Sequence, residues 1–201
     1  MNRIAITGSF LERTILANAL SAMTGFDIMI SPTYSHTAYK YKLNSDISKC
    51  QWPDSYVYCL ETFTQRVIVE QKYGDRFISD GSVMQELGWI KSRYPQNDLI
   101  YEQSMINSLE KVIVEYASNS YDYIFHLGTH KEQDITDQCM LKIFSRHFLD
   151  YKKIDCSDKE SALDRMLEYL HLKPVLSAEF SLFKASGNQL FENPACYENR
   201  N

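Results

Sequence analysis

Glycine, proline and paired cysteines are scarce in this chain, and long apolar runs are missing. Its 201 residues include 7 glycines and 5 prolines and no repeat, which argues against a disordered or repeat architecture. The five cysteines are scattered without a Cys-x-x-Cys pair, so we expect idle thiols rather than a zinc or redox centre. No segment approaches the roughly 18 apolar residues of a membrane span, and the apolar stretch at the N-terminus is too short for a signal peptide. We therefore expect a soluble, cytoplasmic protein without a membrane partner.

Positive charge is also limited, with a net charge of −5 and a pI near 5.5. Non-specific binding of nucleic acid relies on Lys and Arg that neutralise phosphates, so this balance argues against a nucleic-acid partner. Hydrophobic residues make up 44% of the chain, enough for one buried core, and the length suits one domain. A small anionic ligand fits this composition best, and a homodimer or a protein partner is left open.

Apolar periodicity predicts strands that alternate with helices. The predicted strands span 3–7, 26–30, 76–79, 121–127 and 151–156. The predicted helices span 11–23, 55–72, 82–93, 102–117, 137–148 and 159–170. Strands that alternate with helices need crossover connections, so the sequence predicts an α/β fold with three α/β/α layers around a mostly parallel, five-stranded sheet.

One domain is predicted over residues 1–174, followed by a C-terminal extension over 175–201 that could hold an edge strand at 179–183. Ligands of such sheets bind at the carboxyl ends of the strands. Gly8, Asp80 and Gly128 all fall at predicted strand ends, so we expect their surroundings to form one crevice.

The first strand runs into the helix through Gly8-Ser9-Phe10-Leu11-Glu12-Arg13-Thr14. A glycine loop between strand and helix suits phosphate, because loop amides and the helix N-terminus present positive dipole ends to an anion. Together with its flanks, RIAITG and TILANAL, the segment resembles the opening of P-loop kinases of the nicotinamide-ribonucleoside-kinase-like and thymidylate-kinase-like family. The resemblance implies a P-loop kinase-like fold that binds ATP through Gly8, Ser9, Phe10, Arg13 and Thr14, with Thr14 also a ligand of Mg²⁺.

The centre of this loop departs from the Walker pattern GxxxxGK[ST]. Thr14 aligns with the final Ser/Thr, which puts Arg13 in the place of the lysine and Glu12 in that of the second glycine, in a loop one residue short. Glutamate lacks the backbone freedom of glycine and brings negative charge toward the phosphates. Arginine keeps the charge of lysine without its compact geometry. These changes weaken the expected hold on a triphosphate.

A second motif, Phe77 to Met84, resembles the family strand that ends in Asp-Arg-Ser before a helix. The resemblance implies that Asp80 lies near the metal or the acceptor hydroxyl, where it would be catalytic together with Arg13 on phosphate. Gly81 takes the place of the arginine. The alternative for Asp80 is a helix cap shared with Ser82.

Substrate contacts are predicted on three segments. The resemblance makes Gln65 and Arg66, on the helix before that strand, candidates for contact with a base or sugar, and a solvated helix face is the alternative. Ser82 is a further candidate. Residues 33–54 are polar and tyrosine-rich, as in a functional loop, and include the candidate Tyr34. A lid-like loop is expected near 128–137, where Lys131 stands in place of the arginines of an active lid.

Two functions follow from these motifs. The first is an ATP- and Mg²⁺-dependent phosphotransferase that acts on a nucleoside, a nucleotide or a pyrimidine-like acceptor. The second is an inactive pseudokinase that senses a ligand or docks a protein, favoured by departures in the first loop, at Gly81 and in the lid. A third function is modification of bases in DNA, which the net negative charge of the chain argues against.

Overall fold

The computed structural model describes residues 2–8, 10–30, 49–95, 100–128 and 135–172. Several predicted features lie outside these ranges, namely Ser9, Tyr34, Lys131, most of the lid-like loop and the edge strand at 179–183. The side chain of Phe10 is likewise outside the description.

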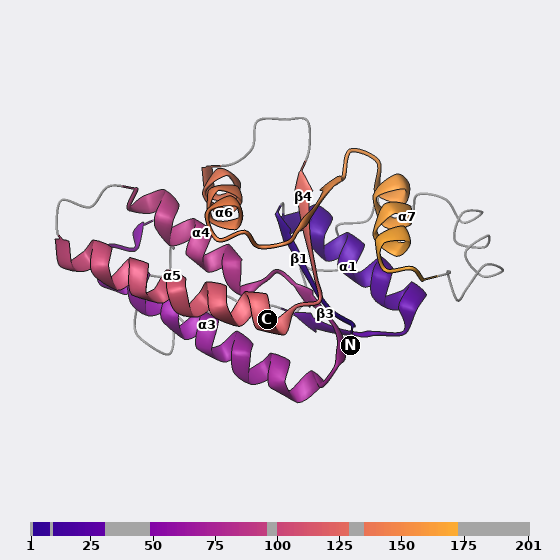
Figure 1. The fold of residues 1–201 in the computed structure, drawn as a ribbon, viewed down its shortest axis with the longest axis horizontal. Helices are drawn as coiled ribbons and strands as arrows, with labels where there is room; N and C mark the ends of the chain where they lie inside the picture. The colour runs from indigo at the N-terminus through magenta and orange to yellow at the C-terminus, as the bar shows by residue number, and fades with distance from the viewer. Residues whose placement is uncertain (1, 9, 31–48, 96–99, 129–134, 173–201) are drawn as a thin grey trace.

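Five parallel strands form the centre of the molecule (Figure 1). They are β1 (Asn2–Gly8), β2 (Asp27–Ile30), β3 (Arg76–Asp80), β4 (Tyr123–Gly128) and β5 (Lys152–Asp155). Their order is β2-β3-β1-β4-β5, and every neighbouring pair is parallel. The predicted five-stranded α/β architecture is therefore confirmed.

Six described helices connect and cover these strands. They are α1 (Phe10–Thr24), α3 (Asp54–Tyr73), α4 (Val83–Arg93), α5 (Ile100–Ser120), α6 (Ile135–Arg146) and α7 (Lys159–Tyr169). The largest departure from the predicted bounds is at the end of α5. Tyr121 donates its backbone N–H to Ala117 as a helical residue would, and β4 begins two residues later. The predicted strand 121–127 thus wrongly included Tyr121, an aromatic residue that precedes the strand.

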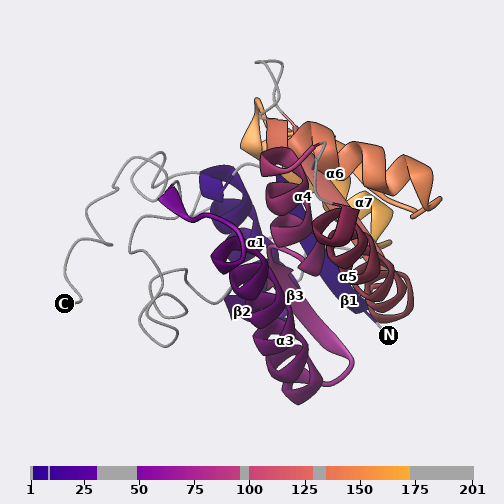
Figure 2. The ribbon, with the colours of Figure 1, turned by 90° about the vertical axis from the view of Figure 1, so that its left-hand side faces the viewer.

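The two faces of the sheet are covered by different helices (Figures 1 and 2). Alternate residues of a strand point to opposite faces. Ile4 and Ile6 of β1 accordingly belong to the core shared with α1 and α7, whereas Ala5 belongs to the core shared with α3, α4, α5 and α6. All three side chains are fully buried, so β1 is apolar throughout because helices cover both of its sides.

Neither a disulfide nor a zinc-type cluster occurs among the described residues. Cys50, Cys59, Cys139 and Cys156 are free thiols. No three or more His, Cys, Asp or Glu side chains of these ranges gather as a metal site would require. In the same ranges, every helix is too short or too polar to cross a bilayer.

His126 is a buried polar residue in the middle of β4, with no exposed surface. Its Nδ1 lies 2.9 Å from Thr7 Oγ1 on β1, and its ring packs edge-on against Phe144 and Tyr151. Its Nε2 has no hydrogen-bond partner among the described residues. Burial, with a smaller effect from Lys153, lowers the pKa of His126 to about 4, so the ring is neutral in the folded protein at pH 7.

We predict that His126 makes the fold sensitive to acid. Between pH 6.5 and 4 the unfolded chain binds a proton at this ring and the folded chain does not, so the free energy of unfolding falls as the pH is lowered through this window. The shift corresponds to about 3 kcal/mol. Urea unfolding at pH 7 and pH 4.5 measures this loss, which His126→Leu should reduce. His171→Asn, at an exposed position, should leave it unchanged. An equal acid loss in His126→Leu would contradict the prediction.

Candidate functional site

The carboxyl ends of β1 and β3 lie next to each other and lead into α1 and α4. Ile6 is in register with Asp80, and Gly81 donates its backbone N–H to Ile6 O at 2.9 Å. Gly8 ends β1 with φ of 103°, and a Cβ at this position would lie 2.3 Å from the carbonyl oxygen of Leu127. Both the backbone angle and the close approach to β4 therefore require glycine.

Asp80 is the centre of the first cluster. Its Oδ1 accepts a hydrogen bond from Arg13 Nε at 2.7 Å, and its Oδ2 accepts one from Thr14 Oγ1 at 2.7 Å. Arg13 also donates from Nη1 to the carbonyl oxygen of Gly8 at 3.3 Å. Arg13 and Asp80 are 4% and 3% exposed, so they form a buried ion pair. Of the predicted nucleotide-binding residues, the structure thus brings Gly8, Arg13 and Thr14 together around Asp80.

The first loop is shorter in the structure than a Walker loop. Because β1 ends at Gly8 and α1 begins at Phe10, the segment Phe10–Thr14 forms the first turns of the helix. An anion at this place would meet the unpaired amides of a helix N-terminus, but few loop amides. Glu12 lies in this first turn, and its charge raises the pKa of Cys156, after burial as the larger cause.

A second polar cluster lies on the other face of β3, around Ser79. Arg66 donates from Nη1 to Ser79 Oγ at 3.0 Å, and Ser79 Oγ donates to Glu70 Oε1 at 3.0 Å. Arg66 and Glu70, both from α3, are completely buried. Arg66 is thus not exposed. It is also not beside Arg13, because their partners Ser79 and Asp80 are adjacent residues of β3 and point to opposite faces of the sheet.

Tyrosines and a second glutamate complete this cluster. Tyr116 donates to Glu70 Oε2 at 2.8 Å, and Tyr121 donates to Glu70 Oε1 at 2.7 Å. Burial and the nearby Glu70 raise the pKa of Tyr116 to about 12 and also raise that of Tyr121, so both keep the protons that they donate. Glu86 Oε1 lies 3.5 Å from Arg66 Nη2, whereas Glu86 Oε2 is buried without a hydrogen-bond partner in the described ranges.

Gln65 and Ser82 have local roles in the structure. Gln65 donates from Nε2 to Glu61 Oε1 at 2.9 Å, one turn back on α3. Ser82 Oγ accepts from the backbone N–H of Met84 at 3.1 Å and caps α4, which confirms its predicted capping role.

Glu86 was not singled out from the sequence. The sequence does contain a signal for it. Glu86 follows Ser82 by four residues and falls on the inner side of α4, and a charged residue at a buried position needs a partner.

We predict that the buried pair of Arg13 and Asp80 stabilises the fold. Arg13→Met leaves the Asp80 carboxylate buried without its cation and should cost about 3–5 kcal/mol. Lys152→Met, which removes an exposed pair with Asp150, should cost less than about 1 kcal/mol. Urea unfolding of Arg13→Met, Asp80→Asn and the double variant gives the coupling energy between the two side chains. A coupling near zero would contradict the prediction.

Comparison with known proteins finds similarity in structure but not in sequence. No protein-family model and no curated protein matches the sequence. Among solved structures, deoxyadenosine kinase from M. mycoides with bound dATP is similar with a TM-score of 0.57 and 14% identity, covering 84% of this chain and 99% of that one. The YorR protein from Bacillus subtilis, in complex with phosphorylated GDP, has a TM-score of 0.53 and 12% identity, covering 85% and 96%. The chain therefore has the fold of the P-loop kinases.

Proposed function

We propose that the chain is an ATP- and Mg²⁺-dependent phosphotransferase that acts on a nucleoside, a nucleotide or a pyrimidine-like acceptor. The observation that carries the proposal is the meeting of Asp80 with Thr14 and Arg13 at the carboxyl ends of β1 and β3. In P-loop proteins a Ser/Thr and an aspartate hold the metal ion, and a cation contacts the phosphates. The fold supports the proposal, because similar structures contain dATP and a phosphorylated GDP.

Thr14 and Asp80 fit the chemistry of a magnesium site. Mg²⁺ in phosphoryl-transfer sites takes one or two protein oxygens and fills its other positions with water and phosphate oxygens. Thr14 Oγ1 and Asp80 Oδ2 lie 2.7 Å apart at one strand end and would supply these two oxygens. When bound, Mg²⁺ neutralises charge on the phosphates that react.

Asp80 is the proposed catalytic residue. Its carboxylate can orient the acceptor hydroxyl and take its proton, since positioning and charge neutralisation dominate phosphoryl transfer. Arg13 is proposed to bind phosphate, and the N-terminus of α1 at Phe10, with Gly8 and Ser9, to present backbone amides to it. Lys131 is proposed to approach the phosphates from the lid.

Arg66 and Glu86 are proposed to bind the acceptor. A buried carboxylate oxygen without a donor is costly, so Glu86 Oε2 is suited to an N–H or O–H of a ligand. An exocyclic amine of a base, or a sugar hydroxyl, supplies such a donor. Tyr34, Gln65 and Ser82 remain proposed contacts to the same acceptor.

An inactive nucleotide-binding protein is the second candidate. Two features favour it. The charge of Arg13 is paired with Asp80 rather than directed at a phosphate, and α1 begins at Phe10, which leaves few loop amides for a phosphate. In this case the scaffold would bind a ligand or a protein partner without transfer.

We predict that Mg²⁺-ATP raises the melting temperature by several degrees at millimolar concentration, because a ligand that binds only the folded state stabilises it. Asp80→Asn should lower turnover about 100-fold or more with the shift retained. Mg²⁺ alone is the control for the metal. Absence of any shift would overturn the kinase proposal. A shift without phosphorylation of any nucleoside, nucleotide or pyrimidine acceptor would favour the inactive protein.

A separate prediction concerns the acceptor pocket. Glu86→Gln should raise KM for the acceptor about 10-fold or more and leave KM for ATP unchanged, because it weakens a charge-assisted hydrogen bond. Glu168→Gln, at an exposed position of α7, is the matched control and should change neither constant. Steady-state kinetics with each substrate varied in turn makes the measurement. Equal changes in both KM values would argue that Glu86 acts on the fold.

A further inference from the structure

Phe148 follows the last residue of α6, and its side chain is 94% exposed. Leu149 donates its backbone N–H to the carbonyl oxygen of Phe144 at 3.0 Å, and Phe148 donates to that of Ser145 at 3.4 Å. The helix thus ends in a Schellman motif, with Phe148 at φ of 53° in the position where glycine is usual. A side chain strains this backbone conformation, and an exposed ring gains nothing from burial. A phenylalanine that disfavours the fold in both ways points to a role in binding.

The segment around Phe148 is basic although the chain is acidic. Residues 142–153 have a net charge of +3, from Lys142, Arg146, Lys152 and Lys153 against Asp150. The net charge of the whole chain is −5, so the rest of the chain carries −8. The acidic average that argues against a nucleic-acid partner therefore hides a local excess of positive charge.

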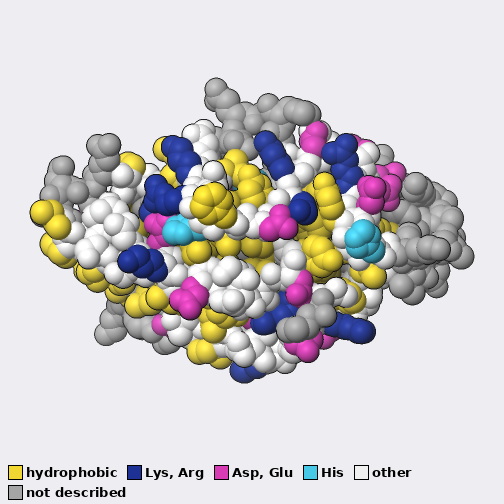
Figure 3. All heavy atoms as spheres, viewed as in Figure 1, with side chains coloured by type: hydrophobic (Ala, Val, Ile, Leu, Met, Phe, Trp, Pro, Cys, Tyr) yellow, Lys and Arg dark blue, Asp and Glu magenta, His cyan; other side chains and the backbone are white. Residues whose placement is uncertain are grey.

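This segment connects α6 to α7 along an edge of the sheet. β5 is an edge strand, and the chain from α6 through β5 to α7 crosses the front of the molecule in Figure 1. Lys152 Nζ lies 6.0 Å from the ring centroid of Tyr169 on α7, and Tyr169 is 43% exposed. Lys and Arg side chains lie among hydrophobic ones over α6 and α7 on this face (Figure 3). We call the following six residues the α6–α7 surface: Lys142, Arg146, Phe148, Lys152, Lys153 and Tyr169.

The cations of this surface are only partly neutralised. The Arg146 side chain is 62% exposed, and its Nη1 lies 3.4 Å from Glu110 Oε1. Glu110 also pairs with Lys91, so one carboxylate is shared between two cations. Lys152 pairs with Asp150 at 2.9 Å on the surface. Exposed ion pairs contribute little stability, so these cations can exchange their carboxylates for phosphates.

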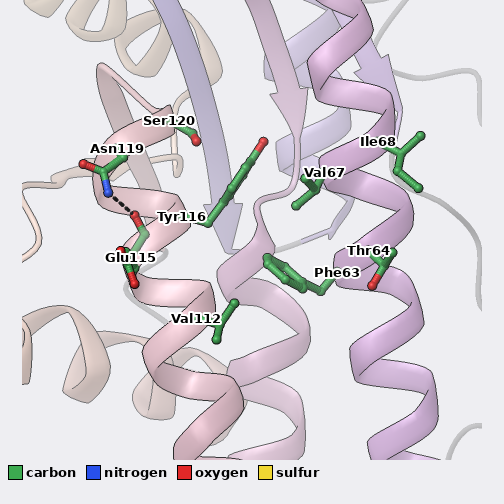
Figure 4. A pocket seen from close by; sticks show the side chains of 9 residues that line it. All are labelled: Phe63, Thr64, Val67, Ile68, Val112, Glu115, Tyr116, Asn119 and Ser120. Carbon is green, nitrogen blue, oxygen red and sulfur yellow. Dashed lines mark hydrogen bonds between the residues drawn. The ribbon is translucent and has the colours of Figure 1, made fainter.

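Aromatic side chains also line a groove between α3 and α5, but there they are packed (Figure 4). Phe63 is 9% exposed and meets Tyr116 edge-on, with ring centroids 5.9 Å apart. The Tyr116 hydroxyl donates to Glu70, and the groove is also lined by the acidic Glu115. A flat ligand with negative charge is therefore suited to the exposed ring of Phe148 and not to this groove.

We propose that the α6–α7 surface binds single-stranded nucleic acid, with a base stacked on Phe148 and phosphates on the neighbouring cations. Proteins that bind single strands combine aromatic side chains, on which bases stack, with positive charge along the backbone. Each nucleotide brings both a flat base and a phosphate, whereas an acidic peptide brings the charge alone. The surface ends near Tyr169, because Asp164 and Glu168 of α7 are exposed acids, so the site takes a few nucleotides.

This proposal is independent of the proposed phosphotransferase. Lys152 begins β5, whereas Asp80 lies at the carboxyl end of β3. A nucleic-acid strand on the α6–α7 surface should therefore not compete with Mg²⁺-ATP.

Fluorescence anisotropy of a labelled dT oligomer of about 15 nucleotides tests the proposal on the full chain. We expect the logarithm of the affinity to fall with the logarithm of the salt concentration, with a slope of about −3, as for four phosphate contacts. Lys142→Gln and Lys153→Gln should each reduce the size of this slope by about 0.7. Lys111→Gln, at an exposed position of α5, is the matched control and should leave the slope unchanged. A U oligomer of the same length shows whether DNA or RNA is preferred.

Replacement of Phe148 separates binding from folding. Phe148→Gly should weaken binding about 10-fold, because it removes the ring on which a base stacks. The same variant should raise the melting temperature by about 2–4 °C, because glycine adopts a positive φ without strain. Phe148→Trp should keep the affinity, whereas Phe148→Leu should lose it as Phe148→Gly does. Tyr101→Ala removes an aromatic side chain that is 57% exposed on α5, and should leave binding unchanged.

Several results would overturn the proposal. One is the absence of binding at low salt. Others are equal affinity for a duplex hairpin, or wild-type affinity of Phe148→Leu, since either shows that no base stacks on the ring. Displacement of the oligomer by poly-glutamate as readily as by unlabelled dT would assign the surface to an acidic protein segment instead. Displacement by Mg²⁺-ATP would place the oligomer at the nucleotide site. Failure of the phosphotransferase proposal is distinguished from all of these, because the melting shift with Mg²⁺-ATP tests it separately.

Discussion

Both oxygens of the Asp80 carboxylate accept hydrogen bonds from α1, and this ties the end of β3 to the first helix across β1. Two other features depend on these hydrogen bonds. Arg13 turns back from the helix toward the sheet and reaches the carbonyl oxygen of Gly8, which fixes the end of β1. Thr14 is held with its hydroxyl beside the carboxylate. The tight turn at Gly8 then lets α1 begin close to the sheet, because no side chain separates Gly8 from β4.

Strand β3 separates two kinds of buried charge. On the face toward α1, one arginine and one aspartate pair within 2.7 Å. On the face toward α3, Arg66 pairs with Glu86, and Ser79 links Arg66 to Glu70. Two tyrosine hydroxyls donate to the carboxylate of Glu70. Buried charges are costly unless they are paired and hydrogen-bonded. Glu86 Oε2 has no hydrogen-bond partner among the described residues, and for this reason the proposed function places the acceptor there.

The fold could be predicted from the sequence because periodicity and strand ends are local properties. The alternation of strands and helices, and the cap at Ser82, depend on a few neighbouring residues each. The resemblance assigned Arg13 and Asp80 to a nucleotide and a metal, but their contact with each other joins residues 67 positions apart and has no local signal. Arg66 on a polar helix was expected to face a ligand or solvent, whereas its actual partners come from β3 and α4. The groove between α3 and α5 depends on how two distant helices pack, and so was not foreseen.

The buried ion pair also sets a condition on nucleotide binding. For Arg13 to contact a phosphate, its guanidinium must leave Asp80 or share itself between two anions, and either change separates a pair that lies out of water. A phosphate can replace the carboxylate as the partner of Arg13, since both accept hydrogen bonds from a guanidinium. The proposed metal ion would then bring a new positive charge to Asp80. Under the proposed function, binding of nucleotide and binding of metal are therefore expected to be coupled, because each replaces one member of this ion pair.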